Sequence, residues 1–192
     1  MNLIDTRTQI LDTAQELIQR LGVNAMSYHD ISIAVGIRKA SIHHHFPTKD
    51  DLVAALLDRY NSYFLRLVDG IITMPIGADE KLRRYCGLFE ATLSSGNHDK
   101  ACLCGMLGAE LATLKNPLVE RVAAFYRDNE ERLAVILNEG CKTGVFEFAG
   151  DVKAMANLIF SLLEGGILIA RADGGVEQYQ AVIGQLMQLV KR

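Results

Sequence analysis

Basic and hydrogen-bonding side chains gather in one short stretch near the amino terminus. Arg38, Lys39 and Lys49 supply positive charge, the histidines at 43–45 add hydrogen-bond donors, and no acidic residue occurs within 31–49. The whole chain is slightly acidic, with 20 Lys and Arg against 23 Asp and Glu. Contact with phosphate requires such a local excess of positive charge. The pattern therefore favours nucleic-acid binding by this stretch, and the alternative is a solvated basic turn on a helical bundle.

The sequence contains no pattern typical of a metal, cofactor or catalytic site. Neighbouring residues on a helix point about 100° apart, so the three consecutive histidines cannot converge on one ion. Cys102 and Cys104, two positions apart on one expected helix, point to opposite sides for the same reason. No phosphate loop of the GxxxxGK[ST] type occurs, and no nucleophile, base and orienting group follow in a recognisable order. We therefore expect no metal, no cofactor and no enzymatic activity.

Cys102 is a candidate reactive thiol. The four cysteines should be reduced, because residues 1–9 lack the features of an export signal and the cytosol keeps thiols reduced. Cys102 lies near Lys100 in the expected first turn of a helix over residues 100–114, where the helix dipole and a cation favour the thiolate. The alternative is a small, buried, apolar cysteine.

Two carboxylates fall within apolar helical segments. Glu110 shares a helix face with Leu103 and Leu107, and Glu164 lies within the apolar stretch 154–170. A carboxylate in apolar surroundings must find a partner, which is either a structural hydrogen-bond donor or a ligand held in a pocket among helices. The residues expected to line such a pocket are Tyr85, Phe89, Cys102, Met106, Glu110, Phe125, Tyr126 and Glu164. Aromatic residues at helical spacing more often belong to an ordinary core, which is the alternative for these members.

Short helices must position the basic stretch. Apolar residues three and four apart, preceded by a capping box from Thr6 to Gln9, predict a first helix over residues 6–21. A second capping box at 27–30 opens a helix of two turns, and a third helix covers residues 39–45. The second and third helices, joined by a tight turn at Gly36, have the dimensions of a helix-turn-helix.

Longer helices are expected after the first three. The alternation of apolar and polar residues that is typical of a strand occurs only briefly, at 144–148. The periodicity predicts helices from Thr48 to about Gly70, around 82–93, over 100–114, from Asn116 past Leu137, over 151–172 and over 179–190. The apolar stretch 154–170 is interrupted by polar residues and is shorter than the roughly 20 residues that a bilayer requires, so we expect no membrane span and a cytoplasmic protein. The sequence thus predicts an all-α protein of nine helices in two parts, a DNA-binding domain over residues 1–47 and a helical bundle over 48–192.

Residues 10–52, ILDTAQELIQRLGVNAMSYHDISIAVGIRKASIHHHFPTKDDL, resemble the amino-terminal domain of the TetR family of transcriptional regulators. The resemblance rests on Gly22, Ile31, Gly36, the stretch 42–46 and the entry to the next helix at 47–52. It implies that the remainder is an all-helical sensing and dimerising domain whose last two helices build a four-helix interface with a partner chain. Residues 101–103 and 108–110 also resemble the sixth-helix motif of a branch that includes thiol-based electrophile sensors.

The resemblance and the helix positions together assign the DNA contacts. The residues expected at the major groove or its edges are Arg38, Lys39, Ser41 and His43, and those expected at phosphates are Ser27, Tyr28, His44, Thr48 and Lys49. Arg38 stands where the family often has Ser or Thr, and His43 where it often has Tyr. The base preference of relatives therefore does not transfer to this chain.

We predict a homodimeric, ligand- or redox-responsive repressor of transcription that binds a palindromic, double-stranded DNA operator. The homodimer is expected to form through the last two helices, 151–172 and 179–190, and an unidentified small molecule or electrophile is the expected inducer. The alternative is an all-helical small-molecule-binding protein or enzyme that does not bind DNA.

Overall fold

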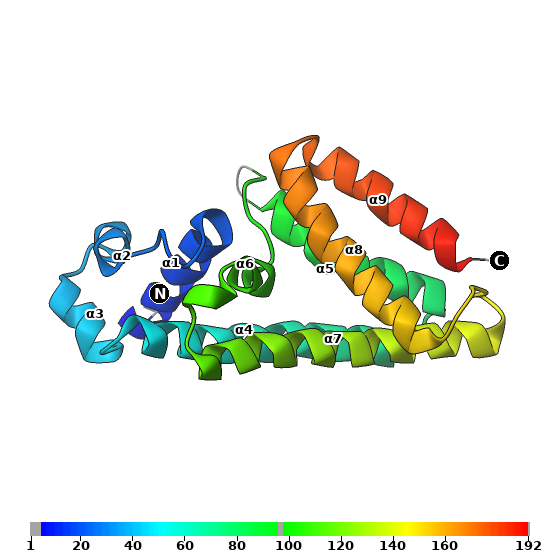
Figure 1. Ribbon diagram of the computed structural model, residues 1–192, viewed down its shortest axis with the longest axis horizontal. Coiled ribbons are helices and arrows are strands. Elements are labelled where there is room, and N and C mark those ends of the chain that lie inside the picture. Colours follow the sequence, from blue (N-terminus) through cyan, green and yellow to red (C-terminus); the bar gives the residue numbers. More distant parts are fainter. Residues whose placement is uncertain (1–4, 96–97, 192) are drawn as a thin grey trace. The chain divides into compact units, whose positions relative to one another are not determined.

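The computed structural model describes residues 5–95 and 98–191, and within them the chain is helical (Figure 1). The helices are α1 (Thr6–Leu21), α2 (Tyr28–Val35), α3 (Lys39–His45), α4 (Lys49–Thr73), α5 (Ala78–Ser94), α6 (Leu103–Ala109), α7 (Asn116–Thr143), α8 (Val152–Ala172) and α9 (Gly175–Val190), with a single 3-10 turn, η1 (Leu111–Thr113), after α6. The described residues contain one isolated β-bridge, between Phe146 and Lys191, and no strand. The all-α prediction with nine helices is confirmed.

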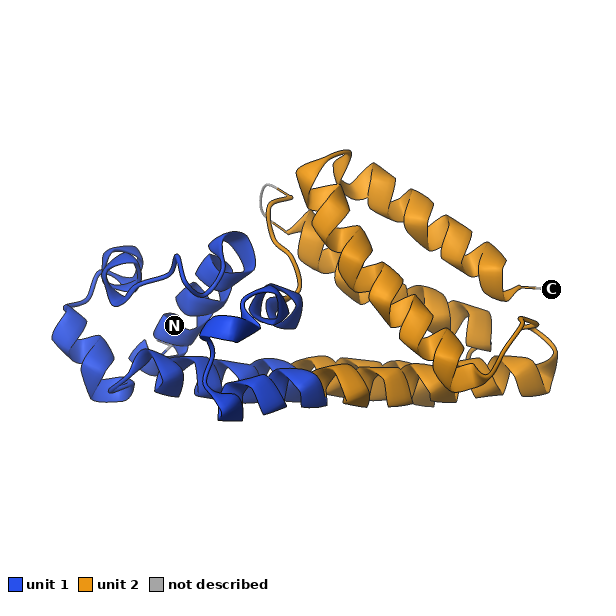
Figure 2. Cartoon of the chain, in the orientation of Figure 1, with its two compact units in different colours: residues 1–62, 103–124 blue, residues 63–102, 125–192 orange. Residues whose placement is uncertain are grey.

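The chain packs as two compact units (Figure 2). Unit 1 comprises Met1–Ser62 and Leu103–Ala124, and unit 2 comprises Tyr63–Cys102 and Phe125–Arg192. Residues of α4 and α7 occur in both units, and α6 belongs with the amino-terminal helices. The boundaries of these packing units therefore differ from residue 47, where the sequence analysis placed the end of the DNA-binding domain.

Local capping interactions define the helix starts in unit 1. Ser27 and Asp30 form the expected capping box before α2, and the Thr48 hydroxyl donates to Asp51 at 2.7 Å before α4. The start of α1 differs from the prediction, because Asp5 is the N-cap and accepts a hydrogen bond from the Thr8 backbone at 2.8 Å. The fully buried apolar side chains of this unit include Ile10, Ala14, Ile18, Ile31, Ile42, Leu52 and Leu56.

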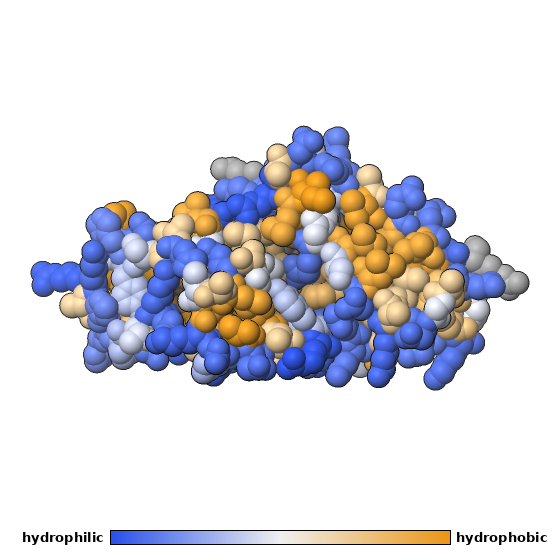
Figure 3. Space-filling view, in the orientation of Figure 1, coloured by the Kyte–Doolittle hydropathy of each residue, from blue (hydrophilic) through white to orange (hydrophobic). Residues whose placement is uncertain are grey.

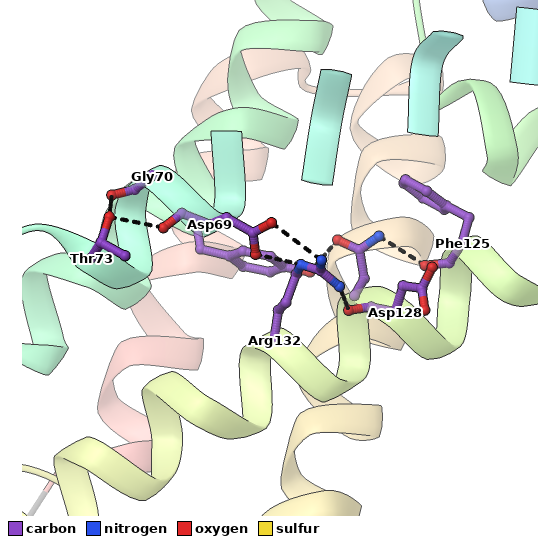
Figure 4. A network of polar contacts seen from close by, with 8 residues as sticks. Asp69, Gly70, Thr73, Phe125, Asp128 and Arg132 are labelled. Carbon is purple, nitrogen blue, oxygen red and sulfur yellow. Dashed lines mark hydrogen bonds and ion pairs between the residues drawn. The ribbon is translucent and has the colours of Figure 1, made fainter. Parts of the chain in front are cut away.

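Aromatic rings and a few polar links hold unit 2 together. The ring of Phe64 makes edge contacts with those of Phe89 and Phe125, with centroids 5.5 and 5.4 Å apart. The Arg132 guanidinium of α7 donates to both carboxylate oxygens of Asp69 in α4, at 2.7 and 3.2 Å, and to a backbone carbonyl of its own helix (Figure 4). The bidentate ion pair fixes these two helical segments of unit 2 against each other.

Two helix predictions need correction. The helix expected over residues 100–114 is only Leu103–Ala109, so Cys102 precedes it instead of lying in its first turn. The apolar stretch 154–170 belongs to a longer helix, α8, whose 21 residues are sufficient by length and composition for a membrane span. The core helices of soluble proteins reach the same length and apolar composition, so α8 by itself is weak evidence for a membrane span.

Candidate nucleic-acid interface and effector site

The α2–α3 segment of unit 1 has the geometry of a helix-turn-helix. Gly36 ends α2 in the left-handed conformation with φ of 75°, and the backbone N–H groups of Gly36 and Ile37 both donate to the Ser32 carbonyl, at 3.0 and 3.1 Å. Ile31 and Ile42 are completely buried and hold the two helices together. The side of α3 opposite Ile42 is exposed to solvent. The four residues predicted to contact the major groove are all exposed, and they are Arg38, Lys39, Ser41 and His43. His44, a predicted phosphate contact, is exposed as well.

Four of the predicted phosphate contacts, Ser27, Tyr28, Thr48 and Lys49, also serve the fold of unit 1. The Tyr28 hydroxyl donates to the carbonyl oxygens of Phe46 and Thr48, at 2.9 and 2.6 Å, and its ring lies 4.8 Å from that of His43. Burial and the nearby Asp51 raise the pKa of Tyr28 to about 12, so the hydroxyl stays a donor. The Ser27 hydroxyl donates to its capping partner at 2.6 Å. Tyr28 therefore anchors the start of α2 to the end of α3.

Lys49, like Tyr28, also stabilises the fold of unit 1. Its ammonium group donates to the Met26 carbonyl at 2.6 Å and is half-buried, and this burial lowers the pKa of Lys49. The residues that line a shallow depression here are Met26, Ser27, Tyr28, His29, Lys39, His43 and Lys49. Lys49 thus ties the turn before α2 to the start of α4, in addition to bringing positive charge to this depression. His29 was not among the predicted contacts, because no sequence pattern distinguishes it.

Glu110 lies elsewhere than predicted. Instead of pointing among apolar side chains, its carboxylate accepts hydrogen bonds from the backbone N–H groups of Val23 and Asn24, at 2.5 and 3.3 Å, and from the Asn24 amide at 3.0 Å. The Asn24 amide also donates to Thr113 at 3.0 Å. Gly22 has a φ of 90°, where other residues are strained, and a Cβ atom added there would lie 2.8 Å from a Glu110 oxygen, so this position favours glycine. The segment after α6 therefore holds the turn between α1 and α2.

The proposed ligand-pocket residues fall in both units. Met106 is half-buried on α6 and, like Glu110, belongs to unit 1. The other predicted pocket residues belong to unit 2, and they are Tyr85, Phe89, Cys102, Phe125, Tyr126 and Glu164. Tyr85, Phe89 and Phe125 are almost fully buried, and the Tyr85 hydroxyl donates to Asn129 at 3.2 Å. Sequence reasoning missed Asn129, a fully buried amide on α7 that also donates to the Phe125 carbonyl at 2.8 Å.

Glu164 is the unusual group in unit 2. Both of its carboxylate oxygens are buried, and within the described part of the chain neither accepts a hydrogen bond of regular geometry. Burial raises the pKa of Glu164 to about 7, and the thiol of Cys102, which approaches this carboxyl, opposes the rise. Buried polar groups are nearly always hydrogen-bonded, so a carboxyl without a regular partner marks a site of interest.

Cys102 is in a different environment from the one predicted. It is 1% exposed and lies directly before a helix of only seven residues, so the helix-dipole argument for a thiolate does not apply. Its notable polar neighbour is Glu164 of α8. Among the described residues, no group of three His, Cys, Asp or Glu side chains is placed to hold a metal ion.

Comparisons with known proteins agree with these features. Residues 10–56 match the family model "Bacterial regulatory proteins, tetR family", and residues 78–186 match "Tetracyclin repressor-like, C-terminal domain". The structure resembles TetR-family regulators from Agrobacterium tumefaciens (32% identity, 97% of each chain, TM-score 0.91) and Legionella pneumophila (31% identity, 100% of each chain, TM-score 0.87).

A transcriptional repressor of Escherichia coli is also similar over most of its length. The HTH-type transcriptional repressor NemR of Escherichia coli is 23% identical over 97% of this chain and 94% of its own. Its crystal structure in the reduced form has the same fold, with a TM-score of 0.83. Members of the family are not enzymes, so the alternative of an enzyme falls away. The chain belongs to the tetR family of bacterial regulatory proteins and is a DNA-binding transcriptional repressor.

Proposed function

We propose that the chain is a homodimeric, effector-responsive repressor that reads a palindromic operator with α3. The observation that carries this proposal is the outward side of α3, where Arg38, Lys39, Ser41 and His43 are exposed while Ile42 is completely buried. Exposed donors on a second helix of this motif are suited to base edges in the major groove. The half-buried Lys49 and the anchored Tyr28 keep α3 in place.

A stripe on α8 supports dimerisation. Leu158, Leu162, Gly165 and Ile169 recur at intervals of four, three and four, so they share one helix face. The three large residues are 43%, 38% and 60% exposed. Figure 3 shows apolar side chains gathered over α8 and α9, where a groove is lined by Leu162, Gln178, Ala181, Val182, Gln185, Leu186, Gln188 and Leu189. An exposed apolar patch of this kind is typical of an interface, and the second copy of the chain is the occupant that a palindromic operator requires.

Gly165 and Gly166 have different roles in this proposal. A Cβ atom added at Gly165 would have no described neighbour within 4 Å, which leaves room for a partner helix. A Cβ atom at Gly166 would lie 3.2 Å from the Tyr179 ring of α9, so this glycine serves packing within unit 2. Substitution of Gly166 would therefore damage the fold, and Leu162 is the better position for testing the dimer.

The effector is proposed to act on the interior of unit 2. The buried Glu164 carboxyl has no regular hydrogen bond, in contrast to the buried Asn129 amide of the same unit, and the Cys102 thiol is buried as well. Cys102 directly precedes α6 in the chain, and Glu110, just after α6, holds the α1–α2 turn. A change at Cys102 therefore reaches the DNA-reading helices through one short helix. Packed interiors repack between discrete arrangements, so shifts of about an ångström are sufficient.

The central experiment is a gel shift with the DNA that flanks the chain's own coding region. The wild-type protein should bind one site with two-fold symmetry, and Lys39→Ala should weaken this binding. Lys153→Ala is the matched control, because Lys153 is an exposed lysine at the start of α8 in unit 2. If Lys39→Ala binds the operator as tightly as Lys153→Ala and the wild type do, Lys39 is not part of the interface.

A further inference from the structure

The hydrogen-bonding role of His43 on α3 is set by the chain itself. Its ring atom Nδ1 lies 3.2 Å from the carbonyl oxygen of Pro47, four residues later in the chain. A carbonyl oxygen only accepts hydrogen bonds, so Nδ1 must carry the proton and donate it. A neutral imidazole has one N–H group and one bare nitrogen, so Nε2 of His43 is left as an acceptor.

A second set of contacts holds the imidazole in place. The Tyr28 hydroxyl donates to the carbonyl oxygens of Phe46 and Thr48, the residues on either side of Pro47. The centroids of the Tyr28 and His43 rings are 4.8 Å apart, and their planes meet at 59°. Both side chains are thus bonded to the same three-residue segment and pack against each other. The imidazole is therefore presented in one orientation and as one tautomer.

The exposed side chains near His43 offer mainly hydrogen-bond donors. Arg38 and Lys39 have donors and no acceptor, whereas the Ser41 hydroxyl can act as either. Donors of this kind suit guanine, whose O6 and N7 atoms both accept in the major groove. Nε2 of His43 therefore brings to this surface an acceptor that Arg38 and Lys39 lack.

A neutral Nε2 acceptor is unsuited to the DNA backbone. Phosphate oxygens also accept, so Nε2 and a phosphate would face each other without a proton between them. In the major groove, by contrast, adenine and cytosine present amino donors at N6 and N4, while guanine and thymine present acceptors. The fixed tautomer of His43 therefore favours a base edge that carries an amino group.

We infer that His43 is a specificity-determining residue, which reads one adenine or cytosine in each operator half-site through Nε2. This inference rests on the proposed function and names the bases that one side chain of α3 selects. A base that presents only acceptors at this position should be bound roughly tenfold less tightly, which is the upper range for one hydrogen bond between neutral groups. The other positions of the half-site should not depend on His43.

The test is selection of binding sites from a pool of random DNA duplexes at about pH 8, where an ordinary imidazole is neutral, followed by sequencing. The wild type should select a palindrome with adenine or cytosine at one position of each half-site. His43→Ala should lose the preference at that position and keep the others. His43→Arg offers only donors and should change the preferred base there to guanine. His98→Ala removes an exposed histidine of unit 2 and, as the matched control, should select the wild-type sequence.

Nuclear magnetic resonance tests the tautomer without DNA. Proton–nitrogen correlation spectra of the imidazoles, assigned by comparison with His43→Ala, should show the His43 proton on Nδ1 at the same pH. A proton on Nε2 would overturn the inference.

The selection experiment separates this inference from the proposed function. Circular dichroism verifies that His43→Ala and His43→Arg are folded. A palindrome that is the same for the wild type and both variants would overturn the role of His43 alone. If the wild type selects no palindrome, the proposed function fails, and the base-reading role of His43 fails with it.

Discussion

Replacing Glu110 with Gln tests how the segment after α6 holds the DNA-reading helices. The Glu110 carboxylate accepts three hydrogen bonds, from the backbone N–H groups of Val23 and Asn24 and from the Asn24 side-chain amide. A carboxylate can accept all three, whereas a Gln amide offers one oxygen and places an NH₂ donor against another donor. At least one backbone N–H of the α1–α2 turn would therefore lose its partner.

The expected cost follows from the burial of these groups. A hydrogen bond to a charged group contributes about 1.5–3 kcal/mol when it is shielded from water. The Val23 bond is partly buried and the two Asn24 bonds are exposed, so only the first keeps most of this value. We expect Glu110→Gln to lower the free energy of unfolding by about 2 kcal/mol, which corresponds to a fall in melting temperature of about 4–8 °C for a chain of this size.

The assay combines thermal melting, followed by circular dichroism, with operator titration below the melting transition. Glu131→Gln, an exposed carboxylate of α7, is the matched control and should melt with the wild type. Glu110→Gln should also bind the operator more weakly, because the turn that it supports leads directly into the N-cap of α2. A melting temperature within about 1 °C of the control, with unchanged operator affinity, would refute this account of Glu110, since the hydrogen bonds to a charged group should cost more than that.

The remaining predictions concern DNA, the dimer and pH. Lys39→Ala should reduce the slope of log affinity against log salt by about 0.9 per protomer, or about two for a dimer, if Lys39 reaches a phosphate at the edge of the major groove, whereas an unchanged slope with weaker binding would mean that Lys39 contacts base edges alone. Leu162→Arg should sediment as a monomer with a native circular dichroism spectrum and should lose operator binding, whereas a dimeric variant would contradict the α8 interface. The raised pKa of Glu164 means that the folded state holds its proton more tightly, so this residue makes the protein less stable as pH rises from about 4.5 to about 7. Glu164→Gln should therefore gain stability over the wild type above this range but not below it, as measured by urea denaturation, and a gain independent of pH would contradict the burial of a charged carboxylate.

Much of unit 1 was predictable because its signals are local. The Ser27–Asp30 capping box and the left-handed Gly36 depend on residues within one or two helical turns, and both appear in the structure as expected. The exposed side of α3 follows from the burial of Ile42 at a known helical spacing. Helical periodicity predicted the ends of helices less well. The helix α6 is much shorter than the 100–114 segment that its apolar pattern predicted, and Cys102 lies outside this helix.

The sequence alone determined the fold class, the helix-turn-helix and its basic side, since helical periodicity, capping and turn residues act over distances of a few residues. Tertiary structure decided the roles of the two acidic residues that the sequence placed on apolar helices. Glu110 bonds to a turn 86 and 87 positions earlier, and the two oxygens of Glu164 are buried without a regular hydrogen bond. Whether a carboxylate finds donors or remains unsatisfied depends on which distant segments pack against it, and no local pattern contains that information.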